Sequence, residues 1–83
     1  MSEVEINFGN AIRKRRQELN ISQEKLAEKA GLHRTYVADV ERGKRNISLK
    51  NLVKIIHALE LPISDFFSEY FFDLNTPRKA DRE

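Results

Sequence analysis

The run from 33 to 46, HRTYVADVERGKRN, combines cationic, hydroxyl and carboxylate side chains with a regular apolar spacing. Its two valines are three residues apart, as on one face of a helix, and at 100° per residue Thr35, Asp39 and Arg42 point nearly the opposite way. A guanidinium such as that of Arg34 can bridge guanine O6 and N7, and hydroxyl or carboxylate groups can bond other base edges. Arg34, Thr35 and Asp39 are therefore the candidates to read nucleic-acid bases, although Arg34 lies nearer the inward side in angle and reaches outward because it is long and stands at the N-terminal end.

The role of Asp39 within this helix stays open between two interactions. Its carboxylate can accept a hydrogen bond from cytosine N4, or it can orient Arg42 or Arg34 through an ion pair. Tyr36 lies at the margin of the helix, so we expect it to contact the sugar-phosphate backbone and not a base. His33 has no second ligand at metal spacing, so we expect a structural or surface role and no metal site.

A short basic loop follows the predicted helix. Gly43 stands where a helix end needs a left-handed residue. Lys44, Arg45 and Asn46 come next along the chain. Because positive charge and N–H groups are enough to bind phosphates, these three residues and Arg42 are expected to contact the DNA backbone. Such contacts supply affinity more than specificity.

A preceding helix has to position this reader, and residues 23–30 have the right pattern. Ser22 can cap that helix, because its hydroxyl accepts a hydrogen bond from an otherwise unpaired backbone N–H. Gly31 follows as the residue that adopts a positive φ at the corner. Gln23 lies beside free N–H groups and the positive end of the helix dipole, which predicts a phosphate contact. The simpler interpretation of Gln23 is an exposed helix start.

Two helices joined at such a corner form a helix-turn-helix, which places its second helix in the DNA major groove. The residues that define the corner are Gln23, Ala27, Gly31, Val37, Val40, Glu41 and Gly43. Their spacing resembles the Cro and phage-repressor (XRE) family of helix-turn-helix proteins. The run LHRTYVADVERGKRNISL resembles more narrowly the controller proteins of restriction–modification systems, which are small dimeric regulators. The likeness covers roughly residues 8–67 and implies an all-α, five-helix, repressor-like DNA-binding domain.

Arg16 differs from the other cations near the N-terminus. It shares a face with the apolar residues of a helix expected at about 7–19, so its side chain should point inward and needs a partner. The family resemblance implies that this partner is Glu41 and that the pair belongs to the scaffold. Removing one member of such a pair costs about 3–5 kcal/mol. Arg13 and Lys14 are expected on a solvated face.

The next predicted helix is the most apolar part of the chain, and Ser48 is expected to cap it. Most of its apolar side chains should lie in the core, closing the domain over the first and third helices. These residues are Leu49, Leu52, Val53, Ile55, Ile56 and Leu59.

A final helix is predicted to begin at Ser64–Asp65, with a serine cap and an acid near the positive dipole end. Its sequence FFSEYFFDL carries more aromatic surface than a short terminal helix can bury on one face. Exposed aromatic patches of that size mark interfaces, so we expect a homodimer formed through the last two helices. The predicted interface residues are Phe67, Tyr70, Phe71 and Phe72.

The predicted organisation is an N-terminal extension at 1–6, a helix-turn-helix domain with its dimerisation helix at 7–74, and a flexible charged tail at 75–83. Through Glu60 there are twelve Lys and Arg against eight Asp and Glu, whereas 61–77 has three acids and no bases. This asymmetry suggests separate faces for a polyanion and for a protein partner. Ordinary solvated surface is the simpler explanation.

Composition excludes several other classes. The chain contains no cysteine, so it has no disulfide framework and no thiolate metal site. It shows no acid pair, nucleophile–base set or glycine-rich phosphate loop, so we predict no enzyme activity, no cofactor and no small-molecule ligand. No apolar run approaches the ~18 residues of a membrane span, which predicts a cytoplasmic protein without a membrane partner.

Together these patterns predict a sequence-specific, double-stranded DNA-binding transcriptional regulator. Its homodimer would present two reading helices about 34–36 Å apart to a pseudo-palindromic operator. The resemblance implies a controller that acts near its own promoter, with RNA polymerase as a further partner. The alternative is an antitoxin-like or other protein-interaction module, whose aromatic helix binds a different chain and in which DNA binding is secondary.

Overall fold

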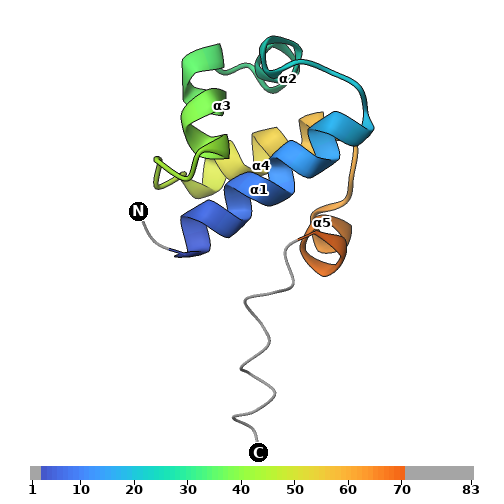
Figure 1. Ribbon diagram of the computed structural model, residues 1–83. Coiled ribbons are helices and arrows are strands. Elements are labelled where there is room, and N and C mark those ends of the chain that lie inside the picture. The colour runs from blue at the N-terminus through green and yellow to red at the C-terminus, as the bar shows by residue number, and fades with distance from the viewer. Residues whose placement is uncertain (1–2, 71–83) are drawn as a thin grey trace, which may run out of the picture.

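The computed structural model describes residues 3–70, which contain five α-helices and no strand. Helix α1 runs across the front of the molecule in Figure 1, with α2 and α3 above it, α4 behind it and α5 below. The all-α, five-helix fold predicted from the sequence is therefore confirmed. The helices are α1 (Glu3–Glu18), α2 (Gln23–Ala30), α3 (Arg34–Glu41), α4 (Leu49–Ala58) and α5 (Ile63–Glu69).

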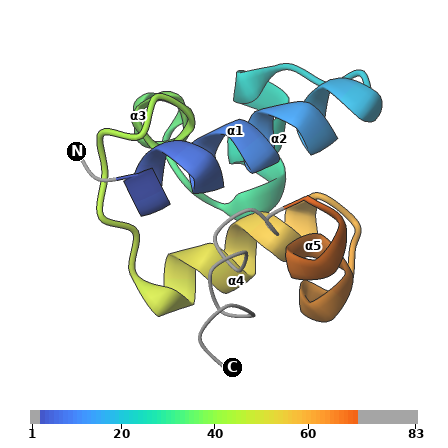
Figure 2. The ribbon, with the colours of Figure 1, turned by 60° about the horizontal axis from the view of Figure 1, so that its bottom comes forward.

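The core lies where the five helices meet. Figure 2 shows α4 and α5 below α1, whereas α2 passes behind α1. Helix α2 packs against both α3 and α4. Burying one large apolar side chain stabilises the fold by about 1.5–3 kcal/mol relative to leaving it exposed, so a few such residues hold a domain of this size together. The large apolar side chains with less than 2% exposure are Ile12, Leu26, Val37, Ile55, Ile56, Leu59 and Phe66.

Helix α1 begins at Glu3, four residues before the start expected from the sequence. Glu3 and Glu5 both lie in the first turn, where the positive end of the helix dipole favours acids. Ile6 packs closely on the chain after α3, since a Cβ built on Gly43 would lie 2.8 Å from Ile6 Cγ1. Residues 3–6, predicted as part of an extension, are thus helical. The predicted tail at 75–83 lies outside the described residues.

Side-chain caps start two of the helices as predicted. The Lys25 backbone N–H donates to Ser22 Oγ at 2.9 Å, and the Asn51 backbone N–H donates to Ser48 Oγ at 3.1 Å. The cap predicted for the last helix is wrong, because α5 begins at Ile63 and Pro62 takes the N-cap position. Proline has a fixed φ and no N–H to satisfy, so Pro62 can serve as the N-cap, two residues before the predicted serine cap. Ser64 therefore lies within the first helical turn.

The corner between α2 and α3 has the backbone geometry that the sequence predicted. Gly31 has a φ of 72°, and the Leu32 N–H donates to the Ala27 carbonyl at 2.9 Å. The end of α3 repeats this arrangement, with Gly43 at φ 74° and the Lys44 N–H bonded to the Asp39 carbonyl at 2.9 Å. In both places a left-handed glycine lets the chain turn back and satisfy the last carbonyls of a helix.

Gly9 has a role that the sequence analysis did not assign. It is a buried residue of α1, and a Cβ added there would lie 2.3 Å from the Val40 carbonyl oxygen and 2.6 Å from that of Glu41. The backbones of α1 and α3 therefore approach one another more closely at this point than any side chain allows. This contact sets the position of the end of α3.

Candidate nucleic-acid interface

The orientation of α3 agrees with its predicted faces. Val37 and Val40 are buried in the core, whereas Arg34 and Thr35 at the N-terminal end are exposed. The sequence pattern predicts this helix at about 33–42, and the observed helix is one residue shorter at each end, because His33 is its extended N-cap and Arg42 its C-cap. The His33 side chain makes no capping hydrogen bond. The first turn of α3 thus presents its polar side chains to solvent.

A buried charge cluster holds the other end of α3. Arg16 Nε donates to Glu41 Oε2 at 2.6 Å, and Arg16 Nη2 donates to Glu41 Oε1 at 3.0 Å. A third Arg16 nitrogen, Nη1, donates to the Ile21 carbonyl at 2.9 Å. Glu41 is only 1% exposed. The structure thus contains the pair that the family resemblance implied, in the bidentate geometry that favours guanidinium and carboxylate.

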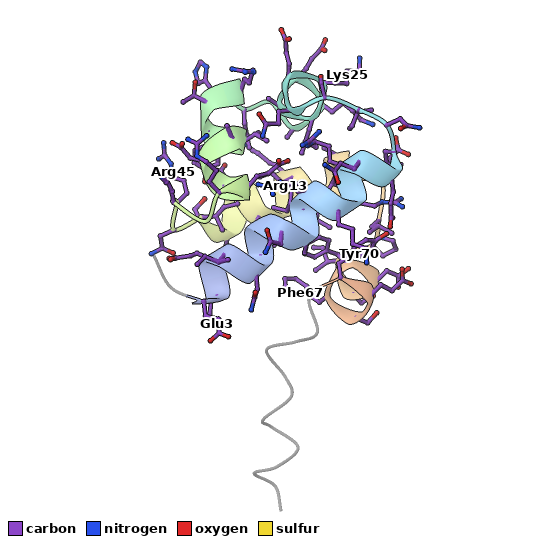
Figure 3. The ribbon with its side chains drawn as sticks, viewed as in Figure 1. Glu3, Arg13, Lys25, Arg45, Phe67 and Tyr70 are labelled. Atoms are coloured by element: carbon purple, nitrogen blue, oxygen red, sulfur yellow. The ribbon has the colours of Figure 1, made fainter. Side chains whose placement is uncertain are left out.

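Two further side chains complete this cluster, although other roles were predicted for both from the sequence. Gln23 Nε2 donates to Glu41 Oε1 at 3.0 Å. Arg13 was expected on a solvated face, but its Nη2 donates to the Glu41 carbonyl at 3.3 Å and its Nε lies 3.6 Å from Oε1 (Figure 3). We call Arg13, Arg16, Gln23 and Glu41 the buried hub, after the buried Glu41 carboxylate at its centre; the Arg13 side chain itself is 42% exposed. The predicted phosphate contact of Gln23 stays a prediction, made by an amide that the hub already orients.

The rest of the basic run in α1 also serves the body of the domain. Arg15 Nε donates to the Leu59 carbonyl at 3.0 Å, which satisfies an unpaired acceptor at the end of α4. Lys14 Nζ lies 6.0 Å from the centre of the Tyr70 ring. Three of the four consecutive cations of α1, Arg13, Arg15 and Arg16, thus form hydrogen bonds within the domain, whereas Lys14 is exposed.

A second charge cluster lies on the exposed side of α3. Arg42 Nη2 is 2.5 Å from Asp39 Oδ1, and Arg45 Nη2 is 3.9 Å from Asp39 Oδ2. The Arg45 guanidinium also lies over the Tyr36 ring, 4.6 Å from its centre, at the edge of the molecule in Figure 3. Asn51 Nδ2 donates to the Tyr36 hydroxyl at 3.1 Å. We call Tyr36, Asp39, Arg42, Arg45 and Asn51 the Asp39 cluster.

The two clusters leave a concave surface beside the start of α3. It has a volume of about 400 Å³ and is bordered by the corner, the first turn of α3, the basic loop and the start of α4. Lys44 and Asn46 lie exposed on the loop next to it. Thr35, predicted to read a base, and Tyr36 and Arg45, predicted to contact the DNA backbone, thus line the same concave surface. The lining residues are Gly31, Leu32, His33, Thr35, Tyr36, Arg45 and Asn51.

The aromatic side chains of α5 that the structure describes pack against the core of the domain and against one another. Phe66 is fully buried, and the rings of Phe67 and Tyr70 pack on it with centres 5.3 Å and 5.9 Å away. The Tyr70 hydroxyl donates to the Glu18 carboxylate, and this hydrogen bond raises the pKa of the phenol. Phe67 and Tyr70 are both partly exposed. Phe71 and Phe72, also predicted in the interface, lie outside the described residues.

Apolar surface near α4 and α5 remains uncovered. Phe67 borders a groove of about 300 Å³ together with Phe8 and Leu52. Two residues predicted in the core of α4 lie outside it: Leu49, at the first position of the helix, is 76% exposed, and Val53 is only half-buried and is not packed against the core. Val4 on α1 is 52% exposed. Large apolar side chains thus remain exposed on both α1 and α4.

Two other kinds of site are missing from the part of the chain that the structure describes. Between Glu3 and Tyr70, no group of three or more His, Cys, Asp or Glu side chains is placed to hold a metal ion. No helix within that range has both the length and the apolar character needed to cross a bilayer.

Comparison with known proteins connects this geometry to a family. The family model described as helix-turn-helix matches residues 12–66. The control protein C.MunI of a Mycoplasma species is 43% identical over 70 residues, which cover 83% of this chain and 95% of that protein. The control protein C.BamHI of Bacillus amyloliquefaciens is 48% identical over 63 residues, which cover 75% and 78%.

Solved structures give the same relationship. The restriction–modification controller protein C.AhdI from Aeromonas hydrophila superposes with a TM-score of 0.72 at 44% identity, covering 75% of this chain and 94% of that one. The controller protein C.Esp1396I, solved as a tetramer with its natural 35 base-pair operator, gives 0.79 at 37% identity, with 82% and 90% covered. The chain thus belongs to the XRE-type helix-turn-helix family of DNA-binding regulators, within which it is similar to restriction–modification controller proteins.

Proposed function

We propose that this chain is a controller-type transcriptional regulator that binds double-stranded DNA as a homodimer on a pseudo-palindromic operator. The observation that carries the proposal is the exposed first turn of α3, on a helix whose opposite end is held by the buried hub and whose exposed side carries the Asp39 cluster. The likeness to C.Esp1396I, which was solved on operator DNA, supports the same function.

Base reading is assigned to the exposed side of α3. Arg34 is at the first position of the helix, where it enters the major groove first and can bridge guanine O6 and N7. Thr35 lies beside it and can bond a base edge or contact a thymine methyl group. Asp39 lies one turn further along and is the third assigned residue.

Affinity is assigned to side chains around that reader. They lie at the start of α2, on the margin of α3 and in the loop after it, where phosphates on both sides of the major groove come within reach. The residues assigned to the DNA backbone are Gln23, Tyr36, Arg42, Lys44, Arg45 and Asn46.

Dimerisation is assigned to α4 and α5, through Phe67, Tyr70, Phe71 and Phe72. The exposed Leu49 and the partly exposed rings of Phe67 and Tyr70 support an interface on this side of the domain. A dimer would set two α3 helices one turn of DNA apart, at about 34–36 Å. RNA polymerase is the further partner that a promoter-bound controller would meet, and a cytoplasmic location belongs to the same proposal.

The proposal is tested by selecting bound duplexes from a random pool and by measuring the mass of the free protein at equilibrium. We expect a pseudo-palindromic consensus and a dimer. A monomer that enriches no sequence would contradict the proposal and favour the protein-interaction alternative, in which α5 binds a different chain.

The assignment of Arg34 is tested on the selected duplex. Arg34→Ala should weaken binding by about 1–3 kcal/mol and relax selectivity at one base pair, because a bidentate contact to guanine is lost. Binding is measured by fluorescence anisotropy on the consensus and on single-base variants of it. Lys54→Ala, which removes an exposed cation from α4, is the matched control and should change the affinity little. Equal losses for both variants would refute the assignment.

A further inference from the structure

Asp39 has two cationic partners that are themselves assigned to phosphates. Its Oδ1 lies 2.5 Å from Arg42 Nη2 and its Oδ2 lies 3.9 Å from Arg45 Nη2, so each carboxylate oxygen faces a different arginine. The Asp39 side chain is 25% exposed, and those of Arg42 and Arg45 are 52% and 46% exposed. One carboxylate thus neutralises part of the positive charge of two assigned backbone contacts.

The position of Arg45 allows a phosphate to replace the Asp39 carboxylate as its partner. Its guanidinium lies between the Asp39 carboxylate and the Tyr36 ring, and Asn51 holds the Tyr36 hydroxyl. Exposed ion pairs are weak because water screens them, so a phosphate can displace the carboxylate while the ring keeps Arg45 in place. The displaced carboxylate then stays on the DNA-facing side of α3 without its partners.

We propose that Asp39 is a discrimination residue, which lowers the affinity for DNA of arbitrary sequence more than the affinity for the operator. On arbitrary DNA the binding energy comes from phosphates, and each contact by Arg42 or Arg45 leaves Asp39 unpaired near other negative charges. On the operator a base amino group, such as cytosine N4, can donate to the carboxylate and restore a partner. Specificity then arises from a repulsion that only the correct sequence relieves.

This inference rests on the proposed function and concerns the discrimination between sequences, not the existence of DNA binding. It unites the two roles that the sequence left open for Asp39. The ion pairs with the arginines set the affinity for arbitrary DNA, and the contact with a base amino group selects the operator.

The first experiment compares Asp39→Asn with Glu28→Gln. Both variants remove one negative charge, but Glu28 lies on the exposed side of α2 with Lys25 as its partner at 3.6 Å. Affinities for the selected duplex and for random duplexes are measured over a series of salt concentrations. Asp39→Asn should bind random DNA about 5–10-fold more tightly, with a salt slope steeper by roughly one, and its ratio of specific to random affinity should fall by a similar factor.

Glu28→Gln should change both affinities by similar factors and leave that ratio intact. If Asp39→Asn also leaves the ratio intact, or weakens binding to random DNA, the inference is overturned. Asp39→Ser is a second neutral variant, and melting followed by circular dichroism checks that both variants remain folded. A wild-type chain that selects no sequence refutes the proposed function instead, so the two failures are distinguishable.

The second experiment asks whether Asp39 acts through its arginines. Asp39→Asn is introduced into a chain that already carries Arg42→Gln and Arg45→Gln, and the four combinations form a double-mutant cycle. The gain in affinity for random DNA should disappear in that background. A gain that persists would show that the charge of Asp39 acts on the DNA directly, and the shared-partner inference would be wrong.

Discussion

Helix α3 carries two carboxylates with opposite environments, and they divide the helix into a scaffold side and a recognition side. Glu41 is 1% exposed and bonds Arg16, Gln23 and Arg13. Asp39 has a quarter of its side chain exposed and pairs with Arg42 and Arg45. The two acids are two residues apart, which is a rotation of about 200° around the helix. Chemically similar groups therefore face the core and the solvent.

The comparison shows that burial determines how much an ion pair contributes to the stability of the fold and how easily its members exchange partners. A buried carboxylate that loses its partner cannot regain solvation, so its pairing is rigid and contributes strongly to the stability of the fold. An exposed carboxylate exchanges its partners with water, salt or a phosphate at little cost. The hub therefore positions α3, while the Asp39 cluster is free to respond to DNA.

The strongest test of this division is the unfolding of Glu41→Ala. We expect the free energy of unfolding to fall by about 3–5 kcal/mol, because Arg16 is left as an unpaired cation in the interior. Urea denaturation followed by circular dichroism measures the change. Asp39→Ala is the matched control on the exposed side and should cost about 1 kcal/mol or less. Similar losses of unfolding free energy in the two variants would show that Glu41 and Asp39 do not differ in their contribution to stability.

The next largest effect on stability is expected at the contact between Gly9 of α1 and the end of α3. Gly9→Ala places a methyl group 2.3 Å from the Val40 carbonyl oxygen, so the two backbones have to separate. We expect a loss of about 1–3 kcal/mol in the free energy of unfolding, from overpacking of a closed contact. Gly31→Ala is a useful contrast, because its φ of +72° is unfavourable while no atom lies within 4 Å. It should cost about 1 kcal/mol through its backbone alone.

On the recognition side the expected effect is on DNA binding and not on folding. Arg45→Ala should weaken binding to all duplexes by a similar factor and lower the salt slope by roughly one, because one phosphate contact is lost. Its unfolding free energy should change by about 0.5 kcal/mol or less. Titrations over a range of salt concentrations on selected and random DNA measure both quantities. A loss confined to the selected sequence would assign Arg45 to base reading instead.

The smallest effect is expected at an ion pair that belongs to neither cluster. Lys29 Nζ bonds Glu60 Oε2 at 2.7 Å, and this hydrogen bond with the lysine charge lowers the pKa of Glu60 below 4.5. A lowered pKa contributes stability above the unfolded value and loses it as the pH falls through the folded value. Glu60→Gln should therefore reduce slightly the drop in Tm between pH 6 and pH 3. Glu60 is fully exposed, so a large change would contradict the rule that exposed pairs contribute little.

The successes of the sequence analysis concern local features. Ser22 and Gly31 mark the ends of α2 through hydrogen bonds within a few residues of the chain, and the spacing of Val37 and Val40 fixes which side of α3 is buried. Such patterns are complete within one helix, so they can be read without the fold. Arg16 was placed inward by the same periodicity, although its partner came from a family resemblance.

The failures concern contacts between distant segments. Arg13 and Gln23 reach Glu41 from 28 and 18 residues away, and Arg15 caps α4 across 44 residues. The four cations of α1 form one basic run, but each receives its role from whichever element lies against it. Gly9 gave no local signal for a related reason, since its lack of a side chain matters only at the crossing with α3.

The sequence by itself determined the helix-turn-helix, the buried side of α3 and the exposed residues that could read a base, because these depend on periodicity and on turn chemistry. The tertiary structure alone decided which charges become scaffold and which remain free for DNA. That decision depends on how far each charge is removed from water, and only the packing of one helix against another determines it.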